Sequence, residues 1–584
     1  MLKDKKKKRV NIFQAIRDFR GEAIKTPVFV ILEVFCEVLI PLLMAGIIDE
    51  GIMKGSMSYI LTRGLLLTVL TLVALYLGVR AGIHGARAGA GLAKNLRQDI
   101  FYRVQKFSFG NIDHFQASSL VTRMTTDINN IQMAYMLTLR LLARTPIMII
   151  LSLVMTLTIN PRVALLFLIA IPFIGLVLVG LAKLAHPIFI RVFDMYDELN
   201  CVVQENVHAA REVKAYVRKE HENQKFAGIS TKLFQLFSKA ERLVAWNAPL
   251  MQLAIYCIIL GILYLGSKDI VRGQMLVGQL TSVVVYAIQI LTSLMLLSFV
   301  FIMNMISEAS RDRVREVLEE EPEMQDRPKS LTEIADGSID FEDVYFSYGS
   351  EGDQPVLQQI NLHIPSGATV GIFGGTGSSK SSLVQLIPRL YDVQQGVVKV
   401  GGVDVRNYNL ASLRDAVSMV LQKNLLFTGS IYENVRWGNP QATDEEVQAV
   451  CREAQADSFI QDFPEGYNTL ISQGGNNVSG GQKQRLCIAR ALLKKPRILI
   501  LDDSTSAVDT KTDARIREAL RRTLPDTTKI IISQRISSIE EADIILIMDE
   551  GRIVAQGSSE ELLQTSPIYR EVYELQNKGG EDHE

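Results

Sequence analysis

Two adjacent carboxylates follow a short apolar run in the last third of the chain. The run at 498–501 (ILIL) predicts a buried strand, and Asp502 and Asp503 come directly after it. One carboxylate in such a position can hold a metal ion, and its neighbour can orient a water for attack. The pattern therefore indicates a hydrolytic site in which Asp503 is the candidate general base.

A glycine-rich turn earlier in the chain has the residue types that bind phosphate. The segment 371–383 (GIFGGTGSSKSSL) predicts a strand, a turn and the start of a helix. Backbone N–H groups of such a turn can point at phosphate oxygens, with Lys380 on the β and γ phosphates and Ser381 on Mg²⁺. Ser379 stands where the usual pattern has its second glycine, so a flexible turn is the alternative. The candidate ATP-binding residues here are Gly374, Gly375, Thr376, Gly377, Ser378, Ser379, Lys380, Ser381 and Ser382.

A second helix start with small residues lies about 100 residues after that turn. The segment 477–485 (NVSGGQKQR) precedes a helical pattern, and Ser479 and Gly480 leave backbone N–H groups accessible at its beginning. A helix N-terminus of this kind favours an anion. Together with the strand that ends at Asp502, it removes the flexible-turn alternative.

This ordered set of motifs resembles that of the ATP-binding cassette (ABC) proteins. The VSGGQ segment of this chain, at 478–482, is similar to the signature motif of that family. The resemblance implies that Tyr348 stacks on adenine and that Gln422 senses Mg²⁺. It implies further that 506–509 form a D-loop, which crosses to the other cassette and ends at Asp509. It also implies a dimer, since in this family each ATP lies between one chain's phosphate loop and the other chain's signature residues. The implied signature residues are Ser479, Gly480, Gly481 and Gln482, and the implied Mg²⁺ ligands are Ser381, Gln422 and Asp502.

Three positions depart from the family pattern within this one nucleotide site. The family has Glu where this chain has Asp503, His where it has Gln534, and Gly where it has Ser379. Aspartate is one methylene shorter, so its carboxylate falls short of the attacking water, and loss of general-base catalysis costs about 10²–10⁴ in rate. Glutamine can hydrogen-bond but cannot carry the proton. We expect Asp503 to be mostly a remnant and ATP to turn over slowly here.

The signature motif is intact apart from Val478, where the family usually has Leu. A homodimer would therefore have two poor sites, whereas a partner with Glu and His at the catalytic positions would complete one good site. This resembles the degenerate subunit of bacterial heterodimeric multidrug ABC exporters. The expected partner is a second half-transporter, in whose site most hydrolysis occurs.

The elements that position these residues are preceded by a membrane domain. Six apolar stretches are long enough to cross a bilayer as helices, at 27–47, 59–83, 137–158, 163–184, 245–266 and 279–305. Basic residues in the intervening segments and in the N-terminal lysine run indicate the cytosolic side. The lysine run itself is either solvated or a membrane-surface anchor.

The predicted fold class is an α-helical six-span transmembrane domain of the type I/IV ABC exporter fold plus an α/β P-loop cassette. We expect the membrane domain at 1–315, a linker at 316–334 and the cassette at 335–578. The resemblance implies a bacterial plasma membrane, with the cassette and both termini cytosolic. Coupling helices are expected at 122–132 and 198–216, where solvated helix surface is the alternative.

Composition and spans exclude other classes. A net charge of −1 over 584 residues gives no argument for nucleic acid, and five scattered cysteines form no disulfide or metal pattern. Six spans exclude a soluble ABC protein. A regulatory membrane subunit, gated by ATP without pumping, is the second reading; the absence of a long regulatory insertion favours the exporter.

The membrane half offers two substrate candidates, Glu33 and Glu37, which lie four residues apart on one helix face. A carboxylate at mid-bilayer costs about 2.5–3.5 kcal/mol, so it is a functional candidate by default. The alternatives are a position near the cytosolic leaflet or a pair with Arg140 or Arg144. Three methionines in 279–305 suit either promiscuous binding or lipid-facing packing. We expect a hydrophobic or amphiphilic substrate, drugs first and then lipids or peptides, in contact with membrane lipids.

Overall fold

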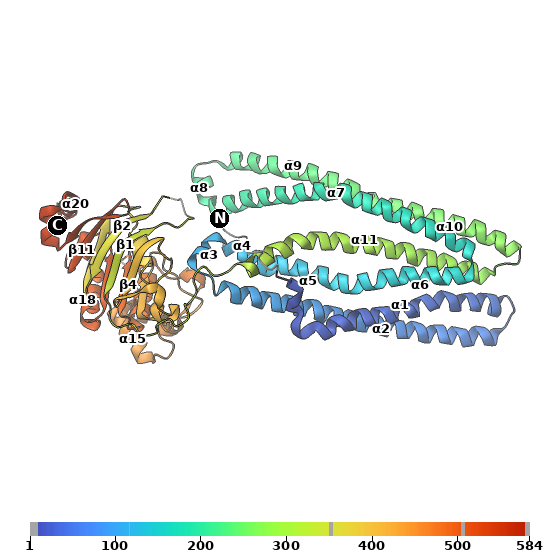
Figure 1. Cartoon of the computed structure of the whole chain (residues 1–584), viewed down its shortest axis with the longest axis horizontal. Helices are drawn as coiled ribbons and strands as arrows, with labels where there is room; N and C mark the ends of the chain where they lie inside the picture. The colour runs from blue at the N-terminus through green and yellow to red at the C-terminus, as the bar shows by residue number, and fades with distance from the viewer. Residues whose placement is uncertain (1–9, 116, 350–353, 504–507, 579–584) are drawn as a thin grey trace. The chain divides into compact units, whose positions relative to one another are not determined.

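The computed structural model describes residues 10–115, 117–349, 354–503 and 508–578. The chain divides into two compact units. The first comprises Met1–Gln105 and Gln116–Glu320, and the second comprises Lys106–Phe115 and Glu321–Glu584. The first unit is helical, whereas the second combines strands and helices (Figure 1).

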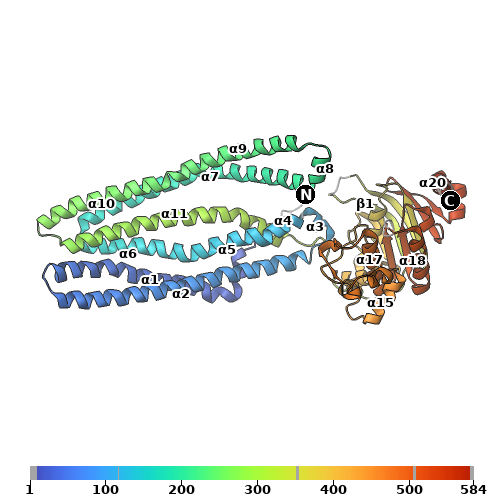
Figure 2. The ribbon, with the colours of Figure 1, turned by 180° about the vertical axis from the view of Figure 1, so that it is seen from behind.

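The first unit consists of long helices that run side by side, as Figures 1 and 2 show from opposite sides. Its elements are η1 (Ile12–Phe19), α1 (Arg20–Gly46), η2 (Ile47–Ile52), α2 (Met57–Val104), α4 (Ala117–Thr122), η3 (Arg123–Asp127), α5 (Ile128–Leu137), η4 (Thr138–Leu142), α6 (Ala143–Ile159), α7 (Pro161–His208), α8 (Ala210–Ala215), α9 (Lys219–Ala245), α10 (Asn247–Val271) and α11 (Val277–Glu319).

Among the described residues, five helical stretches are long and apolar enough to cross a membrane. They are Ile12–Ile52, Met57–Val104, Ala117–Ile159, Lys219–Val271 and Val277–Glu319, and each contains one predicted span. The remaining predicted span, 163–184, falls in α7, where a shorter apolar stretch is described at Pro161–Val177. That stretch is only part of α7, a continuous helix of 48 residues, so α7 itself is long enough to cross a bilayer at 163–184.

Local sequence explains how α6 turns into α7. Asn160 caps α7, and its side chain accepts from the backbone N–H groups of Arg162 and Val163. Pro161 fits the first helical position, where its missing N–H is not needed. The two helices are thus joined by a single non-helical residue.

Polar contacts inside apolar packing hold α1 against α11. The Tyr286 hydroxyl donates to the carbonyl oxygen of Val38 (2.8 Å), and the Ser282 hydroxyl donates to that of Pro41. Val30 and Val34 pack in the same buried cluster. These contacts fix the face of α1 that points into the unit.

The second unit is built on a six-stranded sheet in the order β12-β11-β3-β10-β9-β6, in which only the edge strand β12 is antiparallel. An antiparallel sheet in the order β2-β1-β4-β5 and a two-stranded β7-β8 pair accompany it. The strands are β1 (Ile339–Phe346), β2 (Leu357–Ile364), β3 (Thr369–Gly374), β4 (Gln395–Val400), β5 (Val403–Asp404), β6 (Val417–Val420), β7 (Gly429–Ser430), β8 (Leu470–Ile471), β9 (Ile498–Asp502), β10 (Thr528–Ile532), β11 (Ile544–Asp549) and β12 (Arg552–Gly557).

Helices cover this sheet and complete the unit. They are α3 (Phe109–His114), α12 (Lys380–Gln385), η5 (Val405–Asn407), α13 (Leu410–Ala416), α14 (Ile431–Val435), α15 (Asp444–Glu453), α16 (Asp457–Gln461), η6 (Gly466–Asn468), η7 (Gln473–Gly475), α17 (Gly480–Leu493), α18 (Thr510–Thr523), η8 (Ile536–Ser538), α19 (Ser559–Thr565) and α20 (Pro567–Lys578).

The apolar run before Asp502 is explained by burial on both faces of the sheet. Along β9, Ile498 and Ile500 belong to one buried cluster, whereas Leu499 and Leu501 belong to the other. Central parallel strands read as continuous apolar runs for this reason. The first polar residue, Asp502, appears where the strand reaches the edge of the sheet.

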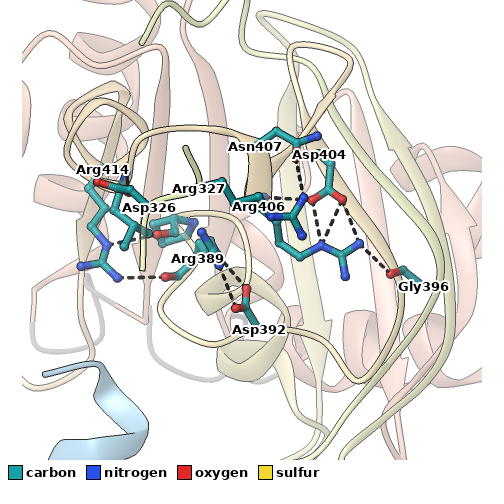
Figure 3. A network of polar contacts seen from close by, with 11 residues as sticks. Asp326, Arg327, Arg389, Asp392, Gly396, Asp404, Arg406, Asn407 and Arg414 are labelled. Atoms are coloured by element: carbon teal, nitrogen blue, oxygen red, sulfur yellow. Dashed lines mark hydrogen bonds and ion pairs between the residues drawn. The ribbon is translucent and has the colours of Figure 1, made fainter. Parts of the chain in front are cut away.

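The segment 321–334 is fastened to the second unit by the polar network of Figure 3. The Asp326 carboxylate accepts from the Asn409 side chain (2.7 Å) and from the backbone N–H of Leu410 (2.8 Å). Arg327 donates to the Asn407 side chain (2.7 Å). The C-terminal part of the predicted linker is therefore an ordered edge of this unit.

Nearby in Figure 3, Arg414 donates to the backbone oxygen of Arg389 (2.9 Å), while Arg389 itself is paired with Asp392. Burial, and then the neighbouring Arg389 charge, lowers the pKa of the Arg414 guanidinium. The Arg414 side chain thus binds the backbone of Arg389, and the Arg389 side chain binds Asp392. Together these contacts order the loop before β4.

Candidate nucleotide site

The strand order brings the predicted site residues to one edge of the sheet. Since β3, β10 and β9 are parallel neighbours, their carboxyl ends meet at the same edge, where open α/β sheets bind ligands. A pocket of about 360 Å³ lies there. It is lined by Val356, Thr376, Gly377, Ser379, Lys380, Ser381, Ser382, Gln422, Asp502, Asp503, Ile532 and Gln534.

Lys380 lies at the centre of the phosphate loop. Its Nζ donates to the backbone oxygens of Gly374 (2.9 Å) and Gly375 (2.7 Å) and to Ser378 Oγ (3.2 Å). Burial lowers the pKa of Lys380, and the charges of Asp502 and Asp503 oppose that shift. A cation in this place suits a polyphosphate, and the role expected for Lys380 remains a proposal.

Ser381 and Asp502 form the part of the pocket that fits magnesium. The Ser381 hydroxyl donates to Asp502 Oδ1 at 2.9 Å, and Gln422 lines the same pocket. Mg²⁺ prefers oxygen ligands and takes one or two carboxylates together with substrate phosphates. Bound there, the ion would neutralise charge on the β and γ phosphates. The residues present fit this group.

Of the three residues that depart from the family pattern, Ser379 is the one in the phosphate loop, and its backbone conformation is unusual for a serine. Its φ is +69°, in the left-handed region, immediately before α12. Glycine adopts this conformation freely, whereas other L-residues lose about 1–2 kcal/mol there. The backbone thus keeps the conformation of a glycine turn although the residue is serine.

We therefore expect Ser379→Gly to raise the unfolding free energy of the cassette by about 0.5–1 kcal/mol, because it relieves the left-handed strain against a smaller gain in chain entropy. Thermal unfolding of the full complex with and without ATP measures this. A matched Ser378→Gly change, at a position without positive φ, should not stabilise. A destabilised Ser379→Gly protein would show that the serine side chain contributes more than its backbone costs.

The two carboxylates at the end of β9 differ in their surroundings. Burial raises the pKa of Asp502, and the Ser381 hydrogen bond opposes the shift. Burial also raises the pKa of Asp503, and the charges of Lys380 and Arg535 oppose it. The Asp503 N–H donates to the backbone oxygen of Ile532 (3.1 Å), and its φ is +46°. Both carboxylates face the pocket, and a raised pKa makes each a stronger base than a free aspartate.

Gln534 reaches the pocket from the end of β10, and its backbone is clamped from the C-terminal helix. Gln576 on α20 donates to the Gln534 carbonyl oxygen (2.9 Å) and accepts from the N–H of Ile536 (2.9 Å). Nothing in the sequence pattern singled out Gln576. An amide in the last helix carries no motif, so only the folded structure reveals that it holds the backbone of Gln534 and Ile536.

Tyr348 packs in a cluster of aromatic rings beside the phosphate helix. Its hydroxyl donates to Ser382 Oγ (2.9 Å), and its ring meets Phe346 and Tyr391 edge-on at 4.9 and 5.0 Å. Half of the residue is exposed, which leaves ring surface for a base. The adenine role predicted for it remains a proposal.

The signature residues form the start of α17, away from this pocket. Ser479 Oγ accepts from the N–H of Gln482, and the Gln482 side chain accepts from the N–H of Ser479, which is a capping box. The pocket lining contains no signature residue among those the structure describes. Asp509 caps α18, and its hydrogen bonds to Thr512 lower its pKa; D-loop positions 506 and 507 lie outside the described residues.

The segment of the N-terminal half that belongs to the second unit is Lys106–Phe115. Asp113 accepts from the Tyr391 hydroxyl (2.8 Å), and the Asn111 amide donates to the Glu321 backbone oxygen (3.1 Å). Neither proposed coupling segment, 122–132 nor 198–216, includes it. The helix α3 has only six residues, too few for a periodic pattern; its one signal is the cap of Ser108.

Glu33 and Glu37 lie in the helical unit. Arg144 donates to both carboxylates, at 3.0 Å to Glu33 and 2.6 Å to Glu37. Arg144 was one of the two arginines left open as partners. Arg140 lines a pocket together with both acids.

Comparisons with known proteins agree with this geometry. Residues 24–294 match the model of the ABC transporter transmembrane region, and residues 357–506 match that of the ABC transporter. The chain is 34% identical to the uncharacterized ABC transporter ATP-binding protein YfiB of Bacillus subtilis over 94% of this chain and 95% of the relative. The chain belongs to the ABC transporter family.

Two further likenesses describe the transporter more closely. This chain is 31% identical to the ATP-dependent lipid A-core flippase of Desulfotalea psychrophila, over 84% of this chain and 85% of that protein. The structure of a bacterial Atm1-family ABC exporter with ATP bound superposes with a TM-score of 0.83, covering 95% of this chain and 98% of the other at 24% identity. This confirms the predicted fold class. The chain is an ABC ATPase-coupled transporter subunit with the fold of that exporter.

Proposed function

We propose that this chain is one subunit of a heterodimeric exporter that moves amphiphilic drugs or lipid-like compounds out of a bacterial cell by alternating access. It would hold ATP in a slow site and supply its signature residues to the partner's site. The observation that carries the proposal is one pocket that contains Ser379, Asp503 and Gln534 beside an otherwise complete phosphate loop. An intact capping box begins α17 elsewhere in the chain.

The placement of these groups supports a division of labour. Lys380, Ser381 and Asp502 retain the groups that bind a polyphosphate with magnesium, so binding is preserved. Asp503 is a shorter acid than the family's Glu, and Gln534 is a neutral amide in place of the family's His, so turnover would be impaired. ATP held without hydrolysis can bias cassette closure only by its differential affinity for the closed state. Hydrolysis in the partner's site would reset the cycle.

A lipid-like substrate is favoured by the similarity to a relative named as an ATP-dependent lipid A-core flippase and by the charged pocket in the helical unit. We propose further that the chain lies in the plasma membrane with its cassette and both termini in the cytosol. The partner would be a half-transporter with Glu and His at the catalytic positions.

Transport by the reconstituted complex tests this function. The affinity-tagged chain is isolated with its partner, reconstituted into proteoliposomes, and supplied with ATP and a fluorescent amphiphile or a labelled short-chain lipid. We expect ATP-dependent accumulation that needs both subunits. Movement only down a gradient, gated by ATP, would instead support the regulatory reading, and full activity of this chain alone would contradict the heterodimer.

A further inference from the structure

A second pocket, of about 530 Å³, lies in the helical unit between α1, α2 and η4. Glu33 and Glu37 contribute to its lining from α1, Leu75, Gly78 and Gly82 from α2, and Arg140 from η4. All of these except Arg140 fall within the first two predicted spans, so the pocket lies at membrane depth. Charged groups at that depth are costly and are therefore functional candidates by default.

Glu33 has a carboxylate oxygen that lacks a hydrogen-bond donor. Its side chain is buried, with 8% of the residue exposed. Arg144 donates to Oε1 at 3.0 Å, while Oε2 has no hydrogen-bond partner among the residues that the structure describes. Buried carboxylate oxygens are normally satisfied. Glu33 lines the pocket but Oε2 itself is buried, so a small rotation of the carboxylate would bring this oxygen to a donor in the pocket.

The charged residues around the pocket indicate the charge of the ligand that supplies this donor. Glu33, Glu37 and Arg144 sum to one negative charge, which favours a cation beside Glu33. The exposed Arg140 guanidinium, at the same pocket, adds one positive charge and makes the set neutral. A ligand that preserves this balance carries one ammonium and one anionic group.

The apolar part of the lining provides for the rest of such a molecule. A Cβ built at Gly82 would meet nothing within 4 Å, so the α2 face is open there, whereas one at Gly78 would lie 2.8 Å from Glu33 Oε1. Leu75 presents an exposed apolar side chain on the same face. The small residues thus leave a groove that leads to Glu33.

We propose that this pocket binds the headgroup of a zwitterionic amphiphile whose primary ammonium donates to Glu33 Oε2 and whose phosphate accepts from Arg140. The acyl chains would lie along the apolar face of α2. The proposal rests on the proposed function and adds the substrate class. It requires an ammonium that still carries N–H, because a quaternary group cannot donate a hydrogen bond.

Binding to the purified full complex in detergent tests the proposal by calorimetry, with dihexanoyl phosphatidylethanolamine as the probe. We expect it to bind at least about tenfold more tightly than the phosphatidylcholine analogue, which lacks the donor, or the phosphatidylglycerol analogue, which lacks the cation. Free phosphoethanolamine, without chains, should bind far more weakly. Equal affinities for the three lipids would overturn the proposal.

Two variants assign the binding to this pocket. Glu33→Gln should lower the affinity for phosphatidylethanolamine about tenfold and leave that for phosphatidylglycerol unchanged. Gly82→Leu should block binding by filling the groove, whereas Gly64→Leu should not. Gly64 is the matched control because it lies on the same helix, its added Cβ also meets nothing within 4 Å, and it is outside the pocket. ATP binding by each variant confirms that the complex is folded.

Each further outcome separates this proposal from the proposed function. Transport that persists while neither variant changes binding would overturn the pocket and leave the exporter standing. Specific binding without ATP-driven transport would support the pocket and contradict the exporter. If Gly82→Leu dissociates the complex and Gly64→Leu does not, a partner helix covers the groove and the proposal is wrong.

Discussion

Gly481→Asp in this chain is expected to lower the ATPase rate of the complex about 10²-fold, the magnitude typical of losing preorganised stabilisation of an anion. Gly481 lies in the first turn of α17, where the N–H groups and the helix dipole favour negative charge. Under the proposed function, a carboxylate there would take the place of the γ-phosphate of the ATP bound to the partner. The same carboxylate stabilises the helix itself, so the loss is not one of folding.

The neutral isostere Gly481→Asn provides the matched control, because it adds the same bulk without the charge. We expect it to retain several times more activity than the aspartate variant when both are measured as steady-state ATP hydrolysis of the purified complex. Equal loss in both would assign the effect to size alone. No loss in either would mean that hydrolysis does not depend on this chain's signature residues.

Lys380→Ala is expected to weaken nucleotide binding in this chain's own site by about 10–100-fold. Its Nζ is the cation held over the loop carbonyls of Gly374 and Gly375, and a hydrogen bond to a charged group contributes about 1.5–3 kcal/mol. Photoaffinity labelling with azido-ATP, followed by separation of the two chains, measures occupancy in each. Labelling of this chain should fall while that of the partner persists.

Lys399→Ala serves as the control for this change, because Lys399 is paired with Glu342 on the antiparallel sheet rather than placed in the pocket. It should leave the labelling of both chains unchanged. Undiminished labelling of the Lys380→Ala chain would contradict the assignment of this loop as a nucleotide site. The complex ATPase should also fall with Lys380→Ala, since closure of the cassettes would lose one of its two ligands.

Much of the nucleotide site could be predicted because its residues lie in short motifs, within which the spacing of residue types is fixed. The loop at 371–383 and the apolar strand before Asp502 have spacing that only a few structures satisfy. What the pattern could not provide is the strand order, in which β10 lies between β3 and β9 and brings Gln534 to the same pocket. That order depends on contacts between segments far apart in the chain.

Long-range contacts also explain two further points, the partner of Glu33 and Glu37 and the unit to which 106–115 belongs. The partner of Glu33 and Glu37 could have been Arg140 or Arg144, which lie one helical turn apart. Packing of α6 against α1 selects Arg144. The segment 106–115 belongs to the second unit through side chains such as Asp113, which no local pattern distinguishes.

The measurement that tests the account most directly is steady-state ATP hydrolysis by the complex co-purified with this chain, comparing wild type with Asp503→Asn. Asparagine keeps the size of the side chain and removes the base. We expect a rate within about twofold of wild type, because hydrolysis would run in the partner's site. A fall toward background, by about 10²-fold or more, would show that Asp503 is a working base and contradict the slow-site account.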